Sequence, residues 1–525
     1  MKRFFEKHNS EIFFVIALLI ASFLYNYHQI LSSRPSIIHQ WRQADCLSIT
    51  MNYYKENLGF FEPAIHWVGA GDGKTVSEFP IIYFTVAQLW KIFGYHEFIF
   101  RLVNLLIVFS GLFCMFKLLK KLLSGTFWAI AVTLFLFTSP ILVYYSNNFT
   151  ADAPAFGFAL IGCYFYCKSL FSNKKKWFYI SFIFFLLAGL VKITALMIFV
   201  AFFAIHIYII VFQRKEKTWY RSASNLLPYF LVIALVFVWY SYAKYYNSHH
   251  VGGIFLQGIL PIWDIDKEAR KQIWMSFRKQ LLPAYFNIKA LYFVLSVFLC
   301  QFLFYRKINK FLFYTNILVF LGSIIYIILF YKVFNVHDYY LTNLLIFIPL
   351  PVIALLEMIN REYPIYLNKV VFKATVVIAI GFLALNTSIL TRMKYNTEDF
   401  LVRHNFIVST DQINQLKYYH TYYSDHIKAF ETITPYLRNI GLKRTDRVLS
   451  LSDGSPNITL YLMDQKGFTD FGYGDLTFSD RIEFFKNHGV KYLVIDSTLH
   501  NQNYLKPYIV KKIGSYKNIE IFKLK

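Results

Sequence analysis

The chain has 525 residues, of which 57% are hydrophobic, 20% aromatic and only 16% charged. Soluble domains carry roughly a quarter charged residues, so this composition excludes an ordinary soluble enzyme and indicates a membrane protein. The formal net charge of +24 would suggest nucleic-acid binding in a soluble protein. Here most lysines and arginines lie in short loops between apolar segments, so they reflect orientation in a lipid bilayer, and we expect no nucleic-acid partner.

Eleven segments are apolar over the roughly 20 residues that a membrane-spanning helix requires. They are residues 12–31, 97–119, 127–146, 153–171, 177–191, 193–212, 226–246, 286–304, 311–333, 339–357 and 370–389. Lys192 either forms the turn between two of these helices or interrupts one long helix. The first segment follows Met1-Lys2-Arg3 as in a signal peptide, but it lacks a cleavage site of small residues, and we expect a retained helix.

The loops between these segments differ in charge. If the N-terminus is cytoplasmic, every loop on the inner side is basic, as the positive-inside rule requires. These inner loops contain Lys117–Lys121, Lys174–Lys176, Arg214–Arg221, Arg306–Lys310 and Arg361–Lys369. We therefore expect the other loops and everything after about residue 390 on the extracytoplasmic side. No eukaryotic targeting signal is evident, which favours a bacterial inner membrane.

The first outer loop, residues 32–96, is long enough to fold. Residues 41–58 predict an amphipathic helix along the membrane surface, and Gly69–Gly73 predicts a flexible turn. The apolar stretch 81–93 is too short to span a bilayer comfortably, and we expect it to be half-buried or interfacial.

The C-terminal tail changes character. Its predicted strands are residues 448–452, 491–496 and 519–524, and its predicted helices are residues 457–464 and 480–487. Alternating strands and helices are typical of a small α/β domain. We therefore predict an all-α polytopic membrane bundle over residues 1–390, which includes the first outer loop, and an extracytoplasmic α/β domain over residues 391–525.

Ionisable and polar side chains gather in the segments predicted to lie on the outer side. They are Arg42, Asp45, Glu78, Asp152, Lys192 and the run His337-Asp338-Tyr339-Tyr340. Because an ionisable group is costly to bury at membrane depth, such a set indicates a functional site. We expect Asp45, Glu78 and Asp152 to converge in one pocket at the outer lip of the bundle.

In order and spacing, these motifs resemble those of the GT-C glycosyltransferases over roughly residues 10–350. The similarity is closer to the protein O-mannosyltransferase and lipid A aminoarabinose transferase-like branch, glycosyltransferase family 39. Members carry an Asp early in the first outer loop and a Glu-x-Pro or x-Pro-Pro segment that opens an apolar stretch. A Phe-Gly pair and an Arg-Leu pair at the start of the next membrane helix follow, and a second acidic residue heads a later helix. The matching positions here are Asp45, Glu78-Phe79-Pro80, Phe93-Gly94, Arg101-Leu102 and Asp152.

The resemblance implies a glycosyltransferase that moves a hexose or pentose from a polyprenyl-phosphate donor to an acceptor, with inversion at the anomeric carbon. The acceptor would be a lipid, a glycan or a protein. Asp45 is the candidate general base for the acceptor hydroxyl, while Glu78 and Asp152 would orient the acceptor, bind sugar hydroxyl groups or sustain the base. Cations and hydroxyl donors would surround the departing phosphate. The candidates for that role are Arg42, Arg101, Lys192, His337, Tyr339 and Tyr340.

The chain departs from the family pattern at two points. Phe79 follows Glu78 where the lipid A transferases carry a basic residue, so the resemblance does not imply the same contacts with the acceptor or the phosphate. The first loop also contains no Asp-x-Asp motif, unlike the metal-dependent oligosaccharyltransferase relatives. We therefore expect a mechanism without a metal or other cofactor.

Structural roles are the alternative for several of these residues. Asp45 can pair with Arg42 on the same helix face, Asp152 can cap the helix that follows it, and Lys192 can extend to the membrane interface. The alternative function is a polyprenyl-lipid or polysaccharide transporter or flippase. A transporter places ionisable residues near mid-bilayer on broken, repeated helices, whereas here they lie at one face and no repeat is visible.

Overall fold

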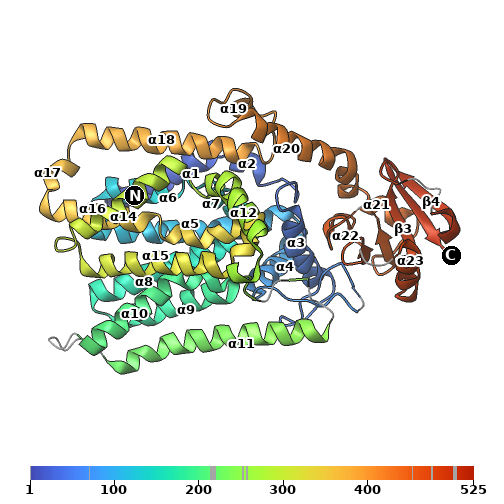
Figure 1. The fold of residues 1–525 in the computed structure, drawn as a ribbon, viewed down its shortest axis with the longest axis horizontal. Helices are drawn as coiled ribbons and strands as arrows, with labels where there is room; N and C mark the ends of the chain where they lie inside the picture. The colour runs from blue at the N-terminus through green and yellow to red at the C-terminus, as the bar shows by residue number, and fades with distance from the viewer. Residues whose placement is uncertain are drawn as a thin grey trace. The chain divides into compact units, whose positions relative to one another are not determined.

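The computed structural model of the protein describes most of the chain (Figure 1). The described residues are 2–69, 71–123, 125–212, 220, 222–250, 254–255, 258–451, 453–473, 477–500 and 505–525. The basic loop 214–221 that was used to predict sidedness therefore lies almost wholly outside them. The chain forms two compact units. Unit 1 comprises Met1–Ser32, Arg101–Tyr240 and Gly258–Arg392, and unit 2 comprises Ser33–Phe100, Ser241–Gln257 and Met393–Lys525.

This division differs from the one expected from the sequence. The first outer loop was placed in the membrane domain of residues 1–390, whereas residues 33–100 pack into the same compact unit as the C-terminal tail. The loop groups with the tail because hydrogen bonds and apolar contacts join the two segments. No local sequence pattern predicts these contacts. The Val68 N–H, for example, donates to the Gly467 carbonyl at 2.9 Å, and Val68 lies in the apolar core of the tail.

Long apolar helices make up most of unit 1. Among the described residues, seven helical segments are long and apolar enough to cross a membrane. They are Glu97–Leu122 (α5), Asp152–Ser172 (α8), Ile193–Phe212 (η1 and α10), Ala223–His249 (η3 and α11), Lys310–Leu329 (α15), Asp338–Glu362 (η7 and α16) and Val370–Arg392 (α18). Two bent helix pairs raise the number to as many as nine.

The predicted count of eleven spans is not confirmed. The apolar part of α1 (Lys2–Leu24) is only His8–Leu24, and α9 (Lys175–Val191) has 17 residues, so both are short for a membrane helix. The remaining helices of this unit are α2 (Tyr27–Ile30), α6 (Thr126–Leu136), α7 (Pro140–Ser146), α12 (Lys267–Ser276), α13 (Leu282–Tyr285), α14 (Ile288–Leu303) and α17 (Pro364–Leu367).

The two bent pairs have identifiable causes. Helices α6 and α7 meet at 82°, where Ser139 caps the second helix and Pro140 begins it. A proline fits the first turn of a helix but cannot continue the preceding one. The segment Lys267–Tyr285 meets α14 at 87°, and the Asn287 side chain accepts from the Lys289 N–H at 3.1 Å to start the second arm.

Helices α5 and α8 pack closely because glycines face each other. A Cβ atom on Gly157 would come within 2.9 Å of the Ile107 carbonyl oxygen, and one on Gly111 within 2.7 Å of the Gly157 carbonyl oxygen. Small residues at such a crossing allow two membrane helices to approach each other. This contact fixes α8, whose first residue is Asp152, against α5.

Two helices of the first loop belong to unit 2. Helix α4 (Ile81–Phe93) buries one face and leaves Ile92 and Phe93 exposed, as expected for a half-buried helix. Helix α3 (Gln40–Lys55) was predicted over residues 41–58 as an amphipathic helix along the membrane surface. The helix is present, but it does not expose a polar face, and its place relative to the membrane stays a prediction. Most of its side chains are buried because the tail covers the face that carries its polar residues.

The tail contains a five-stranded sheet in the order β2-β1-β3-β5-β4. Strands β1 (Arg447–Ser450), β2 (Gly467–Thr469) and β3 (Val490–Asp496) are parallel, and β4 (Ile509–Tyr516) and β5 (Ile519–Leu524) complete the sheet in antiparallel pairing. Its helices are α19 (Phe400–Arg403), α20 (Thr410–Tyr422), α21 (Thr434–Asn439), α22 (Ile458–Leu462) and α23 (Phe478–Asn487). The predicted small C-terminal α/β fold is thus present.

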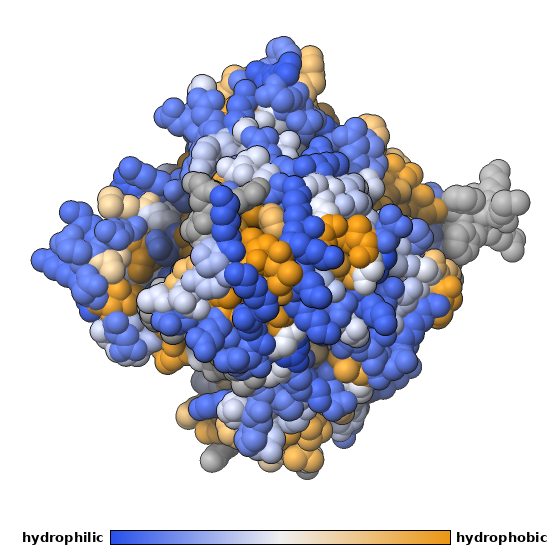
Figure 2. Space-filling view, turned by 90° about the vertical axis from the view of Figure 1, so that its right-hand side faces the viewer, coloured by the Kyte–Doolittle hydropathy of each residue, from blue (hydrophilic) through white to orange (hydrophobic). Residues whose placement is uncertain are grey.

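The core of this sheet is apolar and its outer surface is polar. Leu449 on β1 pairs with Leu493 on β3, which pairs with Phe522 on β5, and all three are buried. The face drawn in Figure 2 is mostly hydrophilic, with apolar residues in separate patches. A polar exterior of this kind suits a domain outside the hydrocarbon.

Candidate active site

Asp45 lies on α3 in unit 2, and its carboxylate accepts a hydrogen bond from a residue of the tail. Its side chain is only 2% exposed, and the Asn457 Nδ2 donates to Asp45 Oδ1 at 2.7 Å. The side chain of Trp41, one helical turn earlier, contributes to lowering the pKa of this carboxyl group. A buried carboxylate with its lone pairs engaged in this way has a defined orientation.

Asn457 is itself fixed in orientation. Its Oδ1 accepts from the Trp67 backbone N–H at 3.0 Å and lies 3.4 Å from the Ser48 hydroxyl. Because a backbone N–H can only donate, the amide oxygen must face Trp67, and the amide NH₂ must face Asp45. The contact therefore delivers a donor to the carboxylate and favours its ionised form.

The loop that presents Asn457 is built around a second buried carboxylate. Asp453 accepts from the Ser455 N–H at 2.9 Å and hydroxyl at 2.6 Å, and from the Thr459 N–H and hydroxyl at 2.7 Å each. Four donors on one side chain close the loop tightly. The position of Asn457 is thus determined by local hydrogen bonds as well as by its contact with α3.

Further polar contacts join the same face of α3 to the tail. Asp45, Ser48, Asn52 and Glu56 follow each other at spacings of three or four residues, so they line one side of the helix. Arg444 pairs with Glu56, and its Nη2 donates to Asn52 Oδ1 at 2.8 Å. The row of contacts holds the helix that carries Asp45 along its length.

The environment of Asp45 shifts its titration into the neutral range. Burial raises the pKa of Asp45 to about 7, against the opposing charge of Arg42 and the hydrogen bond from Asn457. The nearby charge of Glu78 adds to the increase, and the side chain of Trp41 opposes it. A carboxylate whose pKa lies near the working pH is suited to accept and release a proton.

Glu78 lies in a second buried network beside Asp45. Arg42 forms an ion pair with Glu78, Ser77 donates to Glu78 Oε2 at 2.6 Å, and Tyr83 donates to the same atom at 3.0 Å. Both partners of the ion pair are largely buried, so they compensate each other's desolvation. Of the predicted residues, Arg42, Asp45 and Glu78 therefore lie together in unit 2.

A separate cluster in unit 1 contains other predicted residues. Lys192 Nζ lies 3.1 Å from Asp152 Oδ1, 4.7 Å from the centre of the Tyr340 ring and 5.8 Å from that of Tyr339. Asp152 is buried and begins α8, whereas Lys192 lies in extended backbone between α9 and η1. Lys192 thus lies between two separate helices and does not interrupt one long helix.

His337 and Asp338 support this aromatic cluster. The His337 ring centre lies 5.3 Å from that of Tyr339, and Tyr145 donates its hydroxyl to Asp338. Asp338 begins η7 (Asp338–Ile346), the helix that carries both tyrosines. These contacts orient the two rings that face Lys192.

Arg101 is fully buried and contacts the loop that precedes Asp152. Its Nη1 donates to the Asn147 carbonyl, and its guanidinium carbon lies 4.0 Å from the centre of the Phe149 ring. Asn104 on the same helix donates to the Asn148 carbonyl at 2.8 Å and to the Thr150 carbonyl at 3.0 Å. These contacts give Arg101 a positioning role, and its predicted contact with phosphate stays a prediction.

Asn457 was not among the residues predicted for the site. The triplet Asn457-Ile458-Thr459 matches a glycosylation sequon, but Asn457 is buried and bonded to Asp45. The convergence of Asp45, Glu78 and Asp152 in one pocket stays a prediction. Among the described residues no three His, Cys, Asp or Glu side chains are grouped as a metal site, and the expected metal-independent mechanism likewise stays a prediction.

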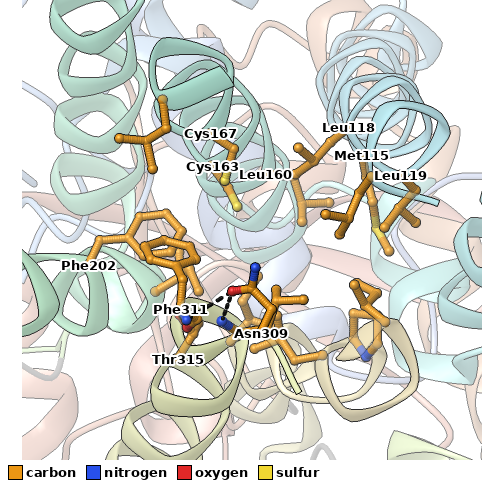
Figure 3. A pocket seen from close by; sticks show the side chains of 18 of the residues that line it. Met115, Leu118, Leu119, Leu160, Cys163, Cys167, Phe202, Asn309, Phe311 and Thr315 are labelled. Atoms are coloured by element: carbon orange, nitrogen blue, oxygen red, sulfur yellow. Dashed lines mark hydrogen bonds between the residues drawn. The ribbon is translucent and has the colours of Figure 1, made fainter. Parts of the chain in front are cut away.

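An apolar cavity of about 240 Å³ lies elsewhere in unit 1 (Figure 3). Side chains of α5, α8, α10 and α15 point into it, among them Met115, Leu160, Cys163 and Phe202. Its polar neighbour Asn309 accepts from two backbone N–H groups that begin α15. Such a lining suits an apolar chain, and none of the predicted site residues contributes to it.

A comparison with known protein families agrees with the predicted resemblance to membrane glycosyltransferases. A family model described as dolichyl-phosphate-mannose-protein mannosyltransferase matches residues 77–242, a range that includes Glu78, Asp152 and Lys192. No curated protein sequence matches the chain. The many-span helical bundle and this match identify a polytopic membrane protein with the fold of the GT-C glycosyltransferases, and the predicted resemblance is confirmed.

Solved structures carry the same fold. The crystal structure of ArnT from Cupriavidus metallidurans in the apo state is 12% identical, with a TM-score of 0.56 over 98% of this chain and 97% of that one. The ArnT structure bound to undecaprenyl phosphate is 11% identical, with a TM-score of 0.56 over 98% of both chains. The arabinofuranosyltransferase AftD from Mycobacteria is 12% identical at a TM-score of 0.53, over 97% of this chain and 41% of AftD.

Proposed function

We propose that this protein transfers a sugar from a polyprenyl-phosphate donor to an acceptor on the extracytoplasmic side of a bacterial inner membrane. The observation that carries the proposal is the buried carboxylate of Asp45, held in one orientation by Asn457 from a distant part of the sequence. The undecaprenyl phosphate bound to ArnT, whose fold this chain shares, supports a polyprenyl-linked donor.

In the proposed reaction Asp45 is the general base. The acceptor hydroxyl oxygen forms a bond to the anomeric carbon while the bond from that carbon to the phosphate oxygen breaks. Asp45 takes the hydroxyl proton, and polyprenyl phosphate leaves with the bonding electron pair. Attack from the face opposite the phosphate inverts the anomeric carbon. A base placed by hydrogen bonds within a buried site typically contributes 10²- to 10⁴-fold in rate, as an order of magnitude.

Lys192 is the proposed contact for the leaving phosphate. Its ammonium lies beside the Tyr340 ring and is paired with Asp152. The phosphate gains negative charge as the sugar departs, and a nearby cation stabilises this charge in the transition state. The hydroxyl groups of Tyr339 and Tyr340 and the His337 ring are the further candidate donors.

Glu78 and Arg42 serve as positioning residues in this proposal. The ion pair between them lies on the segment before α4 and on α3, so it joins the two helices of the first loop. The Arg42 charge also lowers the pKa of Asp45 and keeps part of the population ionised near neutral pH. Asn457 has the same effect through a direct hydrogen bond.

The proposal is tested with the full-length protein in phospholipid vesicles. Undecaprenyl-phosphate sugars carrying a labelled hexose or pentose are supplied with a bacterial envelope extract as the acceptor source. We expect label to appear in the acceptor fraction with wild type and the rate to fall at least roughly tenfold with Lys192→Met, because one charged contact to the phosphate is lost. The matched control is Lys289→Met, at an exposed position of α14.

Two results would contradict the proposal. Label that crosses the bilayer while remaining on the polyprenyl phosphate, without reaching any acceptor, supports the transporter. An equal transfer rate for wild type and Lys192→Met would show that Lys192 does not stabilise the leaving phosphate.

A further inference from the structure

A partly open recess of about 300 Å³ lies in unit 2 beside the first turn of α3. Its lining residues are Ile37, His39, Gln40, Trp41, Tyr419, Tyr422, Tyr423, Ile427 and Ile458. None of them was among the residues predicted for the site. The volume is at the small end of the range for small-molecule sites, so the recess suits a ligand of about one ring and not a long chain.

Aromatic rings form much of the wall. The side chains of Trp41, Tyr419 and Tyr422 are 40%, 45% and 39% exposed, respectively. Trp41 lies on α3 and the two tyrosines lie on α20, so the rings come from separate parts of unit 2. Aromatic faces carry partial negative charge and attract the polarised C–H groups on the flat face of a pyranose ring.

The residues of the same wall also carry polar atoms that can form hydrogen bonds with a ligand. Gln40 donates its Nε2 to the Pro35 carbonyl at 3.1 Å. Within the described part of the chain, the Gln40 Oε1 and the hydroxyls of Tyr419 and Tyr422 have no protein hydrogen-bond partner. Sugar hydroxyl groups supply both donors and acceptors for such atoms, whereas an acyl chain would leave them unsatisfied.

The recess is directly connected to Asp45. Trp41, which forms part of its wall, lies one helical turn before Asp45 on α3. Ile458, another wall residue, follows Asn457, whose amide donates to the same carboxylate. A ligand in the recess therefore lies against two elements that hold Asp45.

We propose that this recess binds a pyranose ring of a carbohydrate acceptor beside Asp45. The inference rests on the proposed sugar transfer and narrows its acceptor, left open between lipid, glycan and protein, to a glycan. The aromatic rings would stack on the sugar, and Gln40, Tyr419 and Tyr422 would bind its hydroxyl groups. Selectivity for the acceptor would thus come from the tail as well as from the first loop.

The test measures binding of methyl pyranosides by saturation-transfer difference NMR. Methyl α- and β-glucoside, galactoside, mannoside and N-acetylglucosaminide are the probes, and the full-length protein is kept in phospholipid nanodiscs so that no glycoside detergent competes. We expect at least one probe to receive saturation at its ring protons. Tyr422→Ala should weaken its binding roughly tenfold because one stacking face and one hydroxyl are lost.

Two further variants make the result specific. Tyr418→Ala is the matched control, since Tyr418 is on the same helix, is 68% exposed and does not line the recess. It should bind the probe as wild type does. Tyr422→Phe keeps the ring and loses only the hydroxyl, so its binding should lie between those of wild type and Tyr422→Ala.

The proposal is overturned if no probe binds, or if Tyr422→Ala binds as tightly as wild type. It is also overturned if octyl glucoside receives saturation in its alkyl chain and not in its sugar ring, because the recess would then be a lipid site. Sugar transfer from undecaprenyl phosphate is measured separately on the same preparation. Intact transfer without pyranoside binding rejects the recess and leaves the proposed function standing.

Discussion

The protonation of Asp45 depends on a small number of side chains with opposing effects. Burial favours the neutral acid, while the Arg42 charge and the Asn457 hydrogen bond favour the carboxylate. A general base acts in its ionised form, so proton transfer should become faster as the pH rises through the pKa of Asp45. Residues that change this balance are expected to move the pH dependence of the reaction.

Asn457→Leu should move the acid limb of the pH–rate profile to higher pH. Asn457 stabilises the carboxylate by donating to it, so its loss raises the pKa of Asp45, by roughly one unit for one hydrogen bond to a charged group. The measurement is kcat/KM for sugar transfer between pH 5 and 9. Thr459→Val is the control, because it loosens the loop at Asp453 and keeps the amide. If the acid limb of the pH–rate profile moves equally in both variants, Asn457 supports the loop and does not act through its hydrogen bond to Asp45.

Arg42→Met should destabilise the protein by about 3 kcal/mol, because Glu78 then remains as a buried charge without its cation. Adding Glu78→Gln removes that charge, and the double variant should recover part of the loss. Thermal unfolding in detergent, followed by circular dichroism, measures both effects. If the two losses simply add, the Arg42–Glu78 pair does not couple energetically.

At the scale of helices and strands, the accuracy of sequence prediction depends on where the partners come from. Helix α4 has the predicted bounds 81–93, since its apolar face and the flanking Pro80 and Gly94 are local signals. Helix α3 was predicted as an amphipathic helix along the membrane surface, which would leave its polar residues exposed. They are buried against Asn457, Arg444 and other tail residues.

The contact that defines the candidate base was beyond sequence reasoning for the same reason. Asn457 and Asp45 are separated by 412 positions, and neither local periodicity nor a short motif links them. Asp45 itself was predictable, because an acidic residue in the first loop matched the motifs of a known family. Its partner was visible only as a sequon, a pattern that describes exposed asparagines.

Gly157→Val should force α5 and α8 apart and disturb the site at the start of α8. The added side chain would collide with the Ile107 carbonyl, which is rigid backbone, so we expect a loss of about 1–3 kcal/mol in stability and a lower transfer rate. The control is Gly381→Val on α18, where a Cβ has no neighbour within 4 Å. Similar melting temperatures for the two variants would show that close packing at Gly157 is unimportant.

For the molecule as a whole, composition predicted the class of fold better than the number of spans. Hydrophobic residues and basic loops indicated a polytopic bundle, and the likeness to ArnT over nearly the whole chain bears this out. The count of spans was less accurate because bent pairs and short helices do not follow a rule of about 20 residues. The grouping of the first loop with the tail needed tertiary contacts.

The most direct test of the account compares Asp45→Asn with wild type in two assays on the same preparation. Asparagine keeps the size and most hydrogen bonds of the residue but cannot accept the proton at neutral pH. We predict that Asp45→Asn binds undecaprenyl phosphate as tightly as wild type and transfers sugar from the undecaprenyl-phosphate donor about 10²- to 10⁴-fold more slowly. Unchanged turnover, or turnover that falls only in proportion to weakened binding, would contradict the role of Asp45 as the base.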